Sequence, residues 1–199
     1  MAYLHEECRD CIIHCDIKLE NILLDVDYNP KVADFGLAKL VGWDFSQVLT
    51  TMRGTGGYLA PEWLSSEAIT PKVDVFSFGK LLFEIILGRR NTNMLNDDSN
   101  YFPTSVANAI NKGEEVMMLL DYKLENSDSI EELTRACKVA CWCIQDNEKD
   151  RPTMRHVVHI LEGVMEVGVP PIPQILQRLA EDPVSSIFYL ESGTCSSSY

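Results

Sequence analysis

The sequence predicts a mainly α domain with one short β-hairpin, and three observations point to this class. Several stretches carry apolar residues at the three- and four-residue spacing of a helix that packs on a core. Two short apolar runs near the N-terminus are separated by turn-forming residues, as in a β-hairpin. Hydrophobic residues make up 46% of the 199 residues and charged residues 24%, which is the composition of a folded protein rather than a disordered one.

The first predicted elements are a helix end and the hairpin. Residues 2–13 have the pattern of a helix that ends there. Residues 21–25 and 31–33 are predicted strands, and the Asp-Tyr-Asn-Pro run at residues 27–30 supplies the turn between them. Residues 37–59 contain Thr, Gly and Ser without a period, so we expect a long loop, and such loops are usually functional.

The central helix has the clearest boundaries. Thr70 is a good N-cap, Pro71 suits the first turn, and Gly88 ends the helix. Because its residues are apolar on nearly every side, we expect this helix to be buried in the middle of the domain. A shorter helix is predicted over residues 104–112, with Gly113 after it.

Two more helices and a tail are predicted towards the C-terminus. Ser129 and Glu132 form a capping box at the start of the next helix. Apolar residues from Met154 to Met165 mark the last core helix, which we expect Gly168 to close. Pro and then Ser are frequent after this point, so we interpret residues 168–199 as a flexible tail.

Charge and cysteine content argue against several classes. The chain has 17 basic and 30 acidic residues and a net charge of −13, which disfavours nucleic-acid and anionic-membrane partners. No apolar run approaches the roughly 20 residues of a membrane span, and the polar N-terminus lacks the pattern of a secretory signal. The seven cysteines, an odd number, lie mostly on apolar stretches, so we expect free thiols in a reducing, cytoplasmic compartment.

Three short motifs occur in order along the chain. HCDIKLEN spans residues 14–21, DFG occupies residues 34–36 and APE occupies residues 60–62. They match the order H-x-D-x-x-x-x-N, D-F-G and A-P-E of protein kinases. Each motif is weak evidence alone. Together, with a hairpin between the first two and a loop between the last two, they are strong evidence.

The residue types fit phosphoryl transfer, which needs positioning and charge neutralisation rather than covalent help. Asp16 would orient the attacking hydroxyl, and Lys18 could balance charge on the transferred phosphate. Asn21 and Asp34 offer the oxygen ligands that Mg²⁺ prefers. Taken singly, Asp16 and Asn21 would be interpreted as turn formers, and Asp34 as a solvated turn carboxylate.

The chain resembles the C-terminal lobe of a eukaryotic protein kinase, and in particular the plant receptor-like serine/threonine kinases with lectin-type ectodomains. The resemblance rests on the phrases YLHEECRDCIIHCDIK, ENILLD, KVADFGLAKL, TTMRGTGGYLAPEWL, ITPKVDVFSFG and DRPTM, and it covers residues 1–167. It implies transfer of the γ-phosphoryl group of ATP to Ser or Thr hydroxyls of a protein substrate, with Mg²⁺ as the metal. Other kinases or an N-terminal lobe are further partners that it implies.

The resemblance also implies roles for single residues. Asp16 would be the catalytic base, with Lys18 beside it, and Thr55 matches the threonine that bonds to both in Ser/Thr-specific kinases. Lys18, Asn21 and Asp34 would bind the cofactor, the last two through the metal. Structural roles fall on Phe35, Gly36, Glu62, Asp74 and Arg151.

Two of these structural roles are specific. Glu62 and Arg151 would form a buried ion pair that ties the long loop to the helical lobe. Asp74 would hold the backbone of the catalytic loop, although a carboxylate at this position also suits the N-terminal dipole of its helix.

The long loop carries candidate phosphorylation sites at Ser46, Thr50 and Thr51, and each of these is equally well explained as a solvated hydroxyl. Cys15 stands where many kinases have an arginine that pairs with the loop phosphate. Since cysteine cannot form that pair, we expect activation to depend less on loop phosphorylation.

Part of the kinase pattern is missing from these 199 residues. The Gly-rich loop, the strand lysine and the helix glutamate all precede the first motif in kinases, and here only thirteen residues precede His14. We therefore expect the N-terminal lobe to be absent and the chain to be inactive alone. The alternative is a truncated, catalytically silent kinase fragment that acts as a protein-interaction module.

Zinc binding is another alternative. The His5, Cys8 and Cys11 region imitates the H-x-E and C-x-x-C motifs of zinc deaminases. At helical spacing these side chains would point in different directions, so core packing explains them better.

Overall fold

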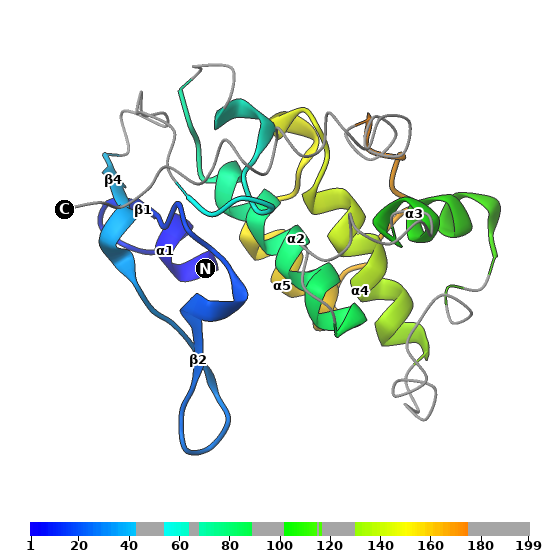
Figure 1. Cartoon of the computed structure of the whole chain (residues 1–199), viewed down its shortest axis with the longest axis horizontal. Helices are drawn as coiled ribbons and strands as arrows, with labels where there is room; N and C mark the ends of the chain where they lie inside the picture. Colours follow the sequence, from blue (N-terminus) through cyan, green and yellow to red (C-terminus); the bar gives the residue numbers. More distant parts are fainter. Residues whose placement is uncertain (43–53, 64–67, 89–101, 115, 117–129, 175–199) are drawn as a thin grey trace.

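The computed structural model describes residues 1–42, 54–63, 68–88, 102–114, 116 and 130–174 (Figure 1). The helices are α1 (Ala2–Glu6), α2 (Lys72–Leu87), α3 (Phe102–Lys112), α4 (Ile130–Cys143) and α5 (Met154–Leu161). The strands are β1 (Cys11–Ile13), β2 (Ile22–Leu24), β3 (Pro30–Val32) and β4 (Lys39–Val41). Short 3-10 turns occupy Leu19–Asn21, Phe35–Leu37, Pro61–Trp63 and Glu148–Asp150. This part of the chain is mainly helical, as the sequence predicts.

Helix α2 is buried at the centre of the helical part and packs along α4 (Figure 1). Thr70 Oγ1 accepts a hydrogen bond from the backbone N–H of Lys72 at 3.2 Å, and the helix ends at Gly88, whose φ of +62° suits glycine. At Gly79 a Cβ would lie 2.7 Å from Cys143 Cβ. The missing side chain therefore lets α2 and α4 approach closely, and the predicted central helix is confirmed.

The prediction of one helix over residues 2–13 is wrong in its second half. Helix α1 ends at Glu6, and β1 pairs antiparallel with β4, so that Ile12 lies opposite Leu40. Strand β4 falls within the predicted loop at residues 37–59, and the described residues thus form two small sheets rather than one hairpin. A three-residue strand is too short to show alternation, and its partner is distant in sequence.

The predicted hairpin is confirmed. Strands β2 and β3 pair antiparallel with Ile22 opposite Val32. Asp25 Oδ1 accepts hydrogen bonds from the backbone N–H groups of Asp27 at 3.0 Å and Asn29 at 2.9 Å, which stabilises the turn. The hairpin projects away from the helices at the bottom of Figure 1.

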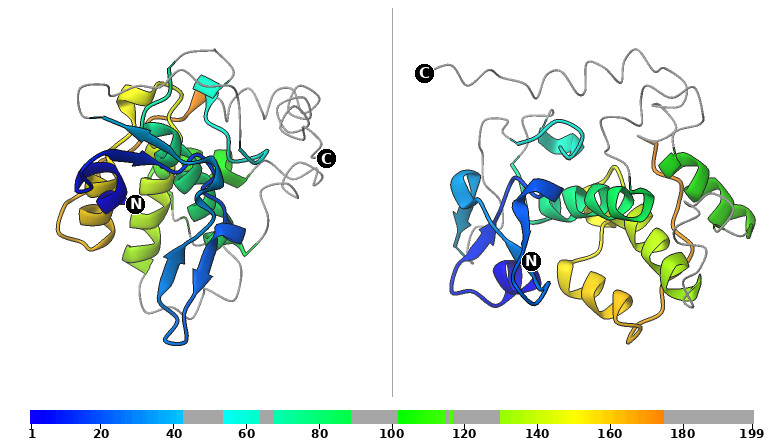
Figure 2. Two further views of the ribbon diagram at one scale, coloured as in Figure 1. Left: turned by 90° about the vertical axis from the view of Figure 1, so that its left-hand side faces the viewer. Right: turned by 60° about the horizontal axis from the view of Figure 1, so that its bottom comes forward.

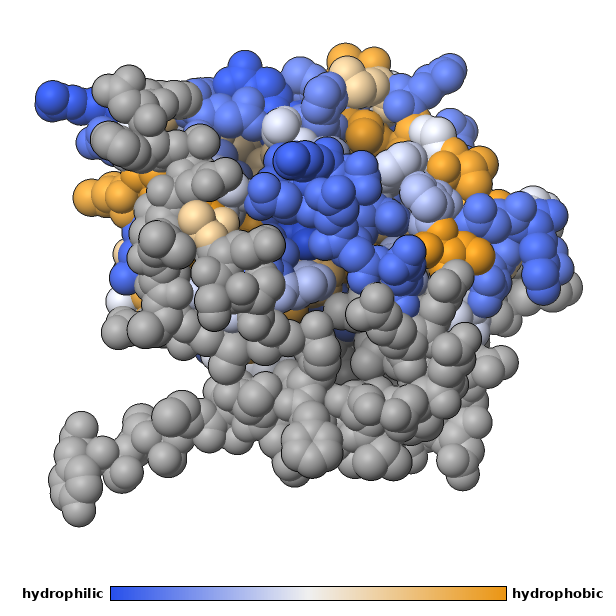
Figure 3. Space-filling model, turned by 90° about the horizontal axis from the view of Figure 1, so that it is seen from above, coloured by the Kyte–Doolittle hydropathy of each residue, from blue (hydrophilic) through white to orange (hydrophobic). Residues whose placement is uncertain are grey.

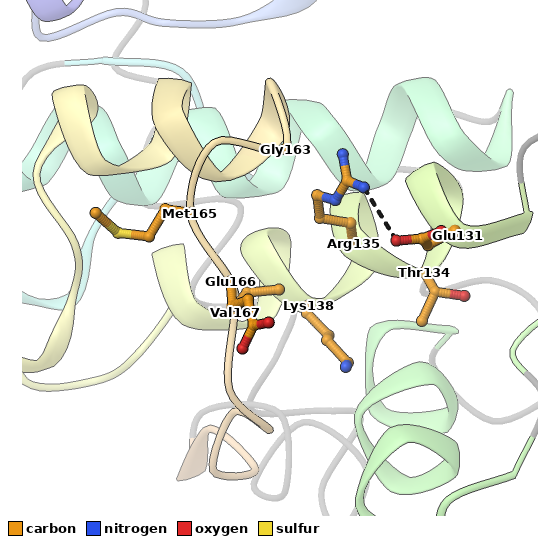
Figure 4. Close-up of a pocket in the computed structure, with 8 residues that line it drawn as sticks. All are labelled: Glu131, Thr134, Arg135, Lys138, Gly163, Met165, Glu166 and Val167. Carbon is orange, nitrogen blue, oxygen red and sulfur yellow. Dashed lines mark hydrogen bonds and ion pairs between the residues drawn. The ribbon is translucent and has the colours of Figure 1, made fainter.

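Helix α5 ends at Leu161, before the predicted end at Met165. The chain turns at Gly163, whose φ is +75°. Arg135 from α4 lies beside this turn (Figure 4). Its Nη1 donates to the carbonyl of Leu161 at 3.4 Å. A pocket of about 500 Å³ separates α4 from residues 163–167. The helix ends here because a glycine turn and a side-chain donor complete its last turn.

Residues 168–174, which we call the strap, lie beside α4 and α3 (Figure 2). They form the beginning of the segment predicted as a tail, and residues 175–199 lie outside the described part. The capping residue Ser129 also lies outside it.

The core lies between the helices. Its largest cluster joins residues of α2, α3 and α4 with those of β1 and β4, and a second cluster joins α2, α4 and α5. On the face shown in Figure 3, the described residues at the centre are hydrophilic and the hydrophobic ones form separate groups. Within the described ranges, no helix combines the length and apolar character needed to cross a membrane.

Candidate active site

Asp16 lies at the centre of a hydrogen-bond network. Thr55 Oγ1 donates to Asp16 Oδ1 at 2.7 Å, and Lys18 Nζ lies 2.9 Å from both Asp16 Oδ2 and Thr55 Oγ1. Asn21 Nδ2 donates to Asp16 Oδ2 at 3.0 Å and to the backbone oxygen of Asp16 at 2.8 Å. The structure thus brings together four of the residues that the sequence singles out, from two segments that are distant in the chain.

Local backbone geometry creates this arrangement. Lys18 is extended, with φ of −158° and ψ of 166°, and the 3-10 turn Leu19–Asn21 then reverses the chain. The backbone N–H of Asn21 donates to the carbonyl of Lys18 at 3.1 Å. The turn therefore places the Asn21 side-chain amide beside Asp16, and the extended conformation of Lys18 lets its side chain contact Thr55.

Asp16 is buried, with 8% of its surface exposed. Burial by itself raises the pKa of this carboxyl, but hydrogen bonds from Lys18, Thr55 and Asn21 and the positive charge of Lys18 together lower it below its ordinary value. Asp16 is therefore an ionised, fully oriented carboxylate at neutral pH.

Asp74 on α2 holds the backbone that precedes Asp16. Its carboxylate accepts hydrogen bonds from the backbone N–H groups of His14 at 2.7 Å and Cys15 at 2.8 Å. His5 Nε2 lies 2.9 Å from the same carboxylate. Cys15 adopts a φ of +66°, a conformation unusual for a residue with a side chain. Asp74 stabilises this conformation by hydrogen-bonding the two successive peptide groups that precede the Cα atom of Cys15.

The DFG segment lies next to the 14–21 segment but is less tightly connected to it. Asp34 is exposed, has a φ of +59°, and accepts a hydrogen bond from the backbone N–H of Gly36 at 3.2 Å. The rings of Phe35 and His14 meet edge to face at a centroid distance of 4.8 Å. Among the described residues, the Asp34 carboxylate makes no hydrogen bond with Asn21 or with Asp16.

Arg151 and Glu62 form the ion pair that the resemblance implies. The two Nη atoms of Arg151 lie 2.6 Å and 2.9 Å from the Glu62 carboxylate oxygens. Arg151 is 2% exposed, and its remaining N–H groups donate to backbone oxygens. These acceptors belong to Gln145 at 2.7 Å, Lys72 at 3.1 Å and Asp146 at 3.1 Å. All five guanidinium donors are satisfied, as a buried arginine requires.

Sequence reasoning missed two buried polar contacts of this region. One is the bond between His5 Nε2 and the Asp74 carboxylate, because the sequence suggests His5 only as a metal ligand. The other joins the Tyr58 hydroxyl to the Glu84 carboxylate inside the apolar α2. Burial and Glu84 together raise the pKa of Tyr58, so the phenol stays protonated and donates. The signal for this contact is Glu84, the single acidic residue in the otherwise apolar run at residues 81–87.

Three remaining candidates, Ser46, Thr50 and Thr51, lie outside the described residues. Cys15 is buried, and burial raises the pKa of its thiol to about 12. The six cysteines in the described ranges have free thiols. Nowhere in these ranges do three or more His, Cys, Asp or Glu side chains form a group that could hold a metal ion. This geometry gives no support to the zinc alternative.

The chain belongs to the protein kinase family: the sequence profile of the protein kinase domain matches residues 1–160. Two G-type lectin S-receptor-like serine/threonine-protein kinases of Arabidopsis thaliana are particularly similar. One is 62% identical over 181 residues and the other 57% identical over 189 residues, and each match covers 90% of this chain. The matches span 22% and 24% of those relatives, so the chain corresponds to about a quarter of their length or less.

Proposed function

We propose that residues 1–167 are the C-terminal lobe of a receptor-like serine/threonine protein kinase, which transfers the γ-phosphoryl group of ATP to Ser or Thr hydroxyls of proteins. The hydrogen-bond network of Asp16, Lys18, Thr55 and Asn21 carries this proposal. It presents one ionised carboxylate and one lysine ammonium at a fixed distance, which is the arrangement that phosphoryl transfer needs.

In this proposal Asp16 orients the substrate hydroxyl and takes up its proton. Lys18, held between Asp16 and Thr55, places a positive charge beside the phosphoryl group as it moves. Thr55 keeps Asp16 in one orientation and connects it to the segment that precedes the APE motif. Asp74, His5 and the Glu62–Arg151 pair act as positioning groups behind this network.

The available oxygen donors fit a magnesium ion. Asn21 directs both of its amide hydrogen bonds to Asp16, which leaves its carbonyl oxygen as a cation ligand. Asp34 is exposed and accepts one hydrogen bond, from Gly36, so its carboxylate retains capacity for a metal. When bound, Mg²⁺ neutralises phosphate charge and ATP supplies the phosphoryl group.

The ATP site is proposed to be completed by an N-terminal lobe, because the 199 residues contain no Gly-rich loop. We further infer that the lobe functions in the cytoplasm, where the six free thiols of the described residues remain reduced. Its protein substrates would bind on the side of Thr55.

Transfer of labelled γ-phosphate from ATP to Ser/Thr peptides tests the proposal. The chain is assayed alone and after fusion to the N-terminal lobe of the 62% identical relative. We expect transfer by the fused protein only. A fused protein that is folded by circular dichroism yet transfers no phosphate would contradict the kinase proposal, and transfer by the chain alone would contradict the need for the second lobe.

A silent interaction module is the second candidate. The observation that favours it is the exposure of Leu23 and Leu24 on β2, at 55% and 61%, because exposed apolar side chains mark interfaces. A folded, inactive fusion protein would favour this candidate over the first.

A further inference from the structure

The strap is held by hydrogen bonds to side chains rather than by strand pairing: the N–H of Gln174 donates to Asp146 Oδ2 at 2.6 Å, and the other bonds come from side-chain donors. Three of its carbonyl oxygens accept hydrogen bonds from three side chains. The pairs are Trp142 Nε1 with Gly168 at 3.2 Å, Asn111 Nδ2 with Pro170 at 2.9 Å, and Gln145 Nε2 with Pro171 at 2.9 Å. Proline has no N–H, so adjacent prolines present only acceptors, and the surrounding donors match that chemistry.

Burial along the strap repeats every three residues. Pro170 and Pro173 are buried, whereas Val169 and Pro171 are exposed. Ile172 packs against the main core cluster. Three residues is the period of the polyproline II helix, which places the two buried prolines on one face. A P-x-x-P segment with one buried face is the form in which proline-rich ligands dock into grooves.

Two of the donors are oriented by helix carbonyls: Asn111 lies on α3, and Gln145 lies two residues beyond the end of α4. Asn111 Nδ2 also donates to the carbonyl of Ala107 at 2.9 Å, and Gln145 Nε2 also donates to the carbonyl of Cys141 at 2.9 Å. One N–H of each amide is thus fixed by α3 or α4, and the other points to the strap. Gln145 is 6% exposed, and a buried amide without a second partner would be costly. The site is therefore preorganised for a carbonyl-rich segment.

We propose that α3 and α4 form a recognition groove for an extended, proline-rich segment of the P-x-x-P type, and that the chain's own strap occupies it. The strap joins the two helices, because Asn111 belongs to α3 whereas Trp142 and Gln145 belong to the α4 side. Docking of this segment stabilises the position of α3. This binding site is separate from the network around Asp16 and does not depend on kinase activity.

Amide hydrogen exchange in the full chain tests whether the chain's own strap occupies the groove. In Asn111→Asp an acceptor replaces the donor that faces Pro170, so we expect the strap amide of Gln174, which donates to Asp146 Oδ2, and the α3 amides to exchange about tenfold faster. Asn108→Asp makes the same chemical change one turn away on α3 and is expected to exchange like the wild type. Equal exchange in the two variants would overturn the proposal.

Peptide binding in the full chain tests recognition directly. Ile172→Asp places a charge in the core and is expected to release the strap. A fluorescein-labelled VGVPPIPQ peptide should then bind saturably, at least about tenfold more tightly than to the wild type, whose groove is filled. A peptide with alanine at both positions equivalent to Pro170 and Pro173 should not bind. Equal binding of the two peptides would overturn the proposal, and if Ile172→Asp fails to fold, the exchange experiment decides.

Discussion

Glu62 and Arg151 lie 89 residues apart in the sequence and form a buried, two-point ion pair. The pair joins the APE turn to the segment between α4 and α5. Phe76 of α2 lies under the Arg151 guanidinium at 5.0 Å from the ring centroid. This contact therefore connects three parts of the fold through one desolvated cation.

Removing one partner of this pair should be strongly destabilising. Glu62→Ala leaves the guanidinium buried without its counter-ion, so we expect the free energy of unfolding to fall by about 3–5 kcal/mol. Glu6→Ala removes one of the two carboxylate partners of the half-exposed Arg155, the other being Glu7, and should cost at most about 1 kcal/mol. Urea unfolding measures the free energy of unfolding of both variants. Similar losses of this free energy in the two variants would contradict the burial of the Glu62–Arg151 pair.

Gly79 tests how closely α2 and α4 pack. Gly79→Ala gains about 0.5–1 kcal/mol of helix propensity, but the new methyl group would overlap Cys143 and Ile144 and cost about 1–3 kcal/mol. We expect net destabilisation in thermal or urea unfolding. Gly42→Ala is the control, because a Cβ there meets nothing within 4 Å. A Gly79→Ala variant more stable than wild type would show that the helices are further apart.

The lowered pKa of Asp16 predicts a specific pH dependence. The folded-state pKa lies below the unfolded value of about 3.9, so the stabilisation is present above that value and is lost as pH falls through the folded-state pKa. The difference in unfolding free energy between wild type and Asp16→Asn should be constant near neutrality and shrink below about pH 4. A difference that grows in acid would contradict the network.

Because Cys15 replaces the usual arginine, we expect the phosphoryl-transfer activity to depend only weakly on phosphorylation of the loop. The Cys15 thiol is buried and donates to the carbonyl of Ile13 at 3.6 Å, so it offers no charge to a phosphate. In the fused protein, alanine at Ser46, Thr50 and Thr51 should leave most of the transfer rate, measured with labelled ATP. Thr55→Ala should lower the rate about 100-fold, because Thr55 orients Asp16. Loss of activity in the triple variant would refute this prediction.

The sequence predicts contacts between residues that are distant in the chain only where both residues belong to recognisable motifs. Glu62 and Arg151, and Asp74 with the backbone of the 14–21 segment, follow from the resemblance and are found in contact. The central helix and the hairpin follow from local patterns. The β1–β4 pair does not, because each strand has three residues and the partners are distant in the chain.

Buried polar contacts and side-chain docking were also beyond local patterns. His5 meets Asp74 through a contact that no period or motif encodes, and the P-x-x-P pattern of the strap does not tell which helices it contacts. Among the described residues Asp34 makes no hydrogen bond with Asn21, and the proposed metal pair rests on the oxygen donors of the two side chains.

The rate of γ-phosphate transfer by the Asp16→Asn variant of the fused protein tests the central claim most directly. If Asp16 is the base, kcat should fall by about 10²–10⁴-fold, while the matched Asp27→Asn variant keeps the rate of the unaltered fusion. A folded Asp16→Asn variant that transfers phosphate as fast as the Asp27→Asn control would contradict the assignment of Asp16 and the kinase mechanism built on it.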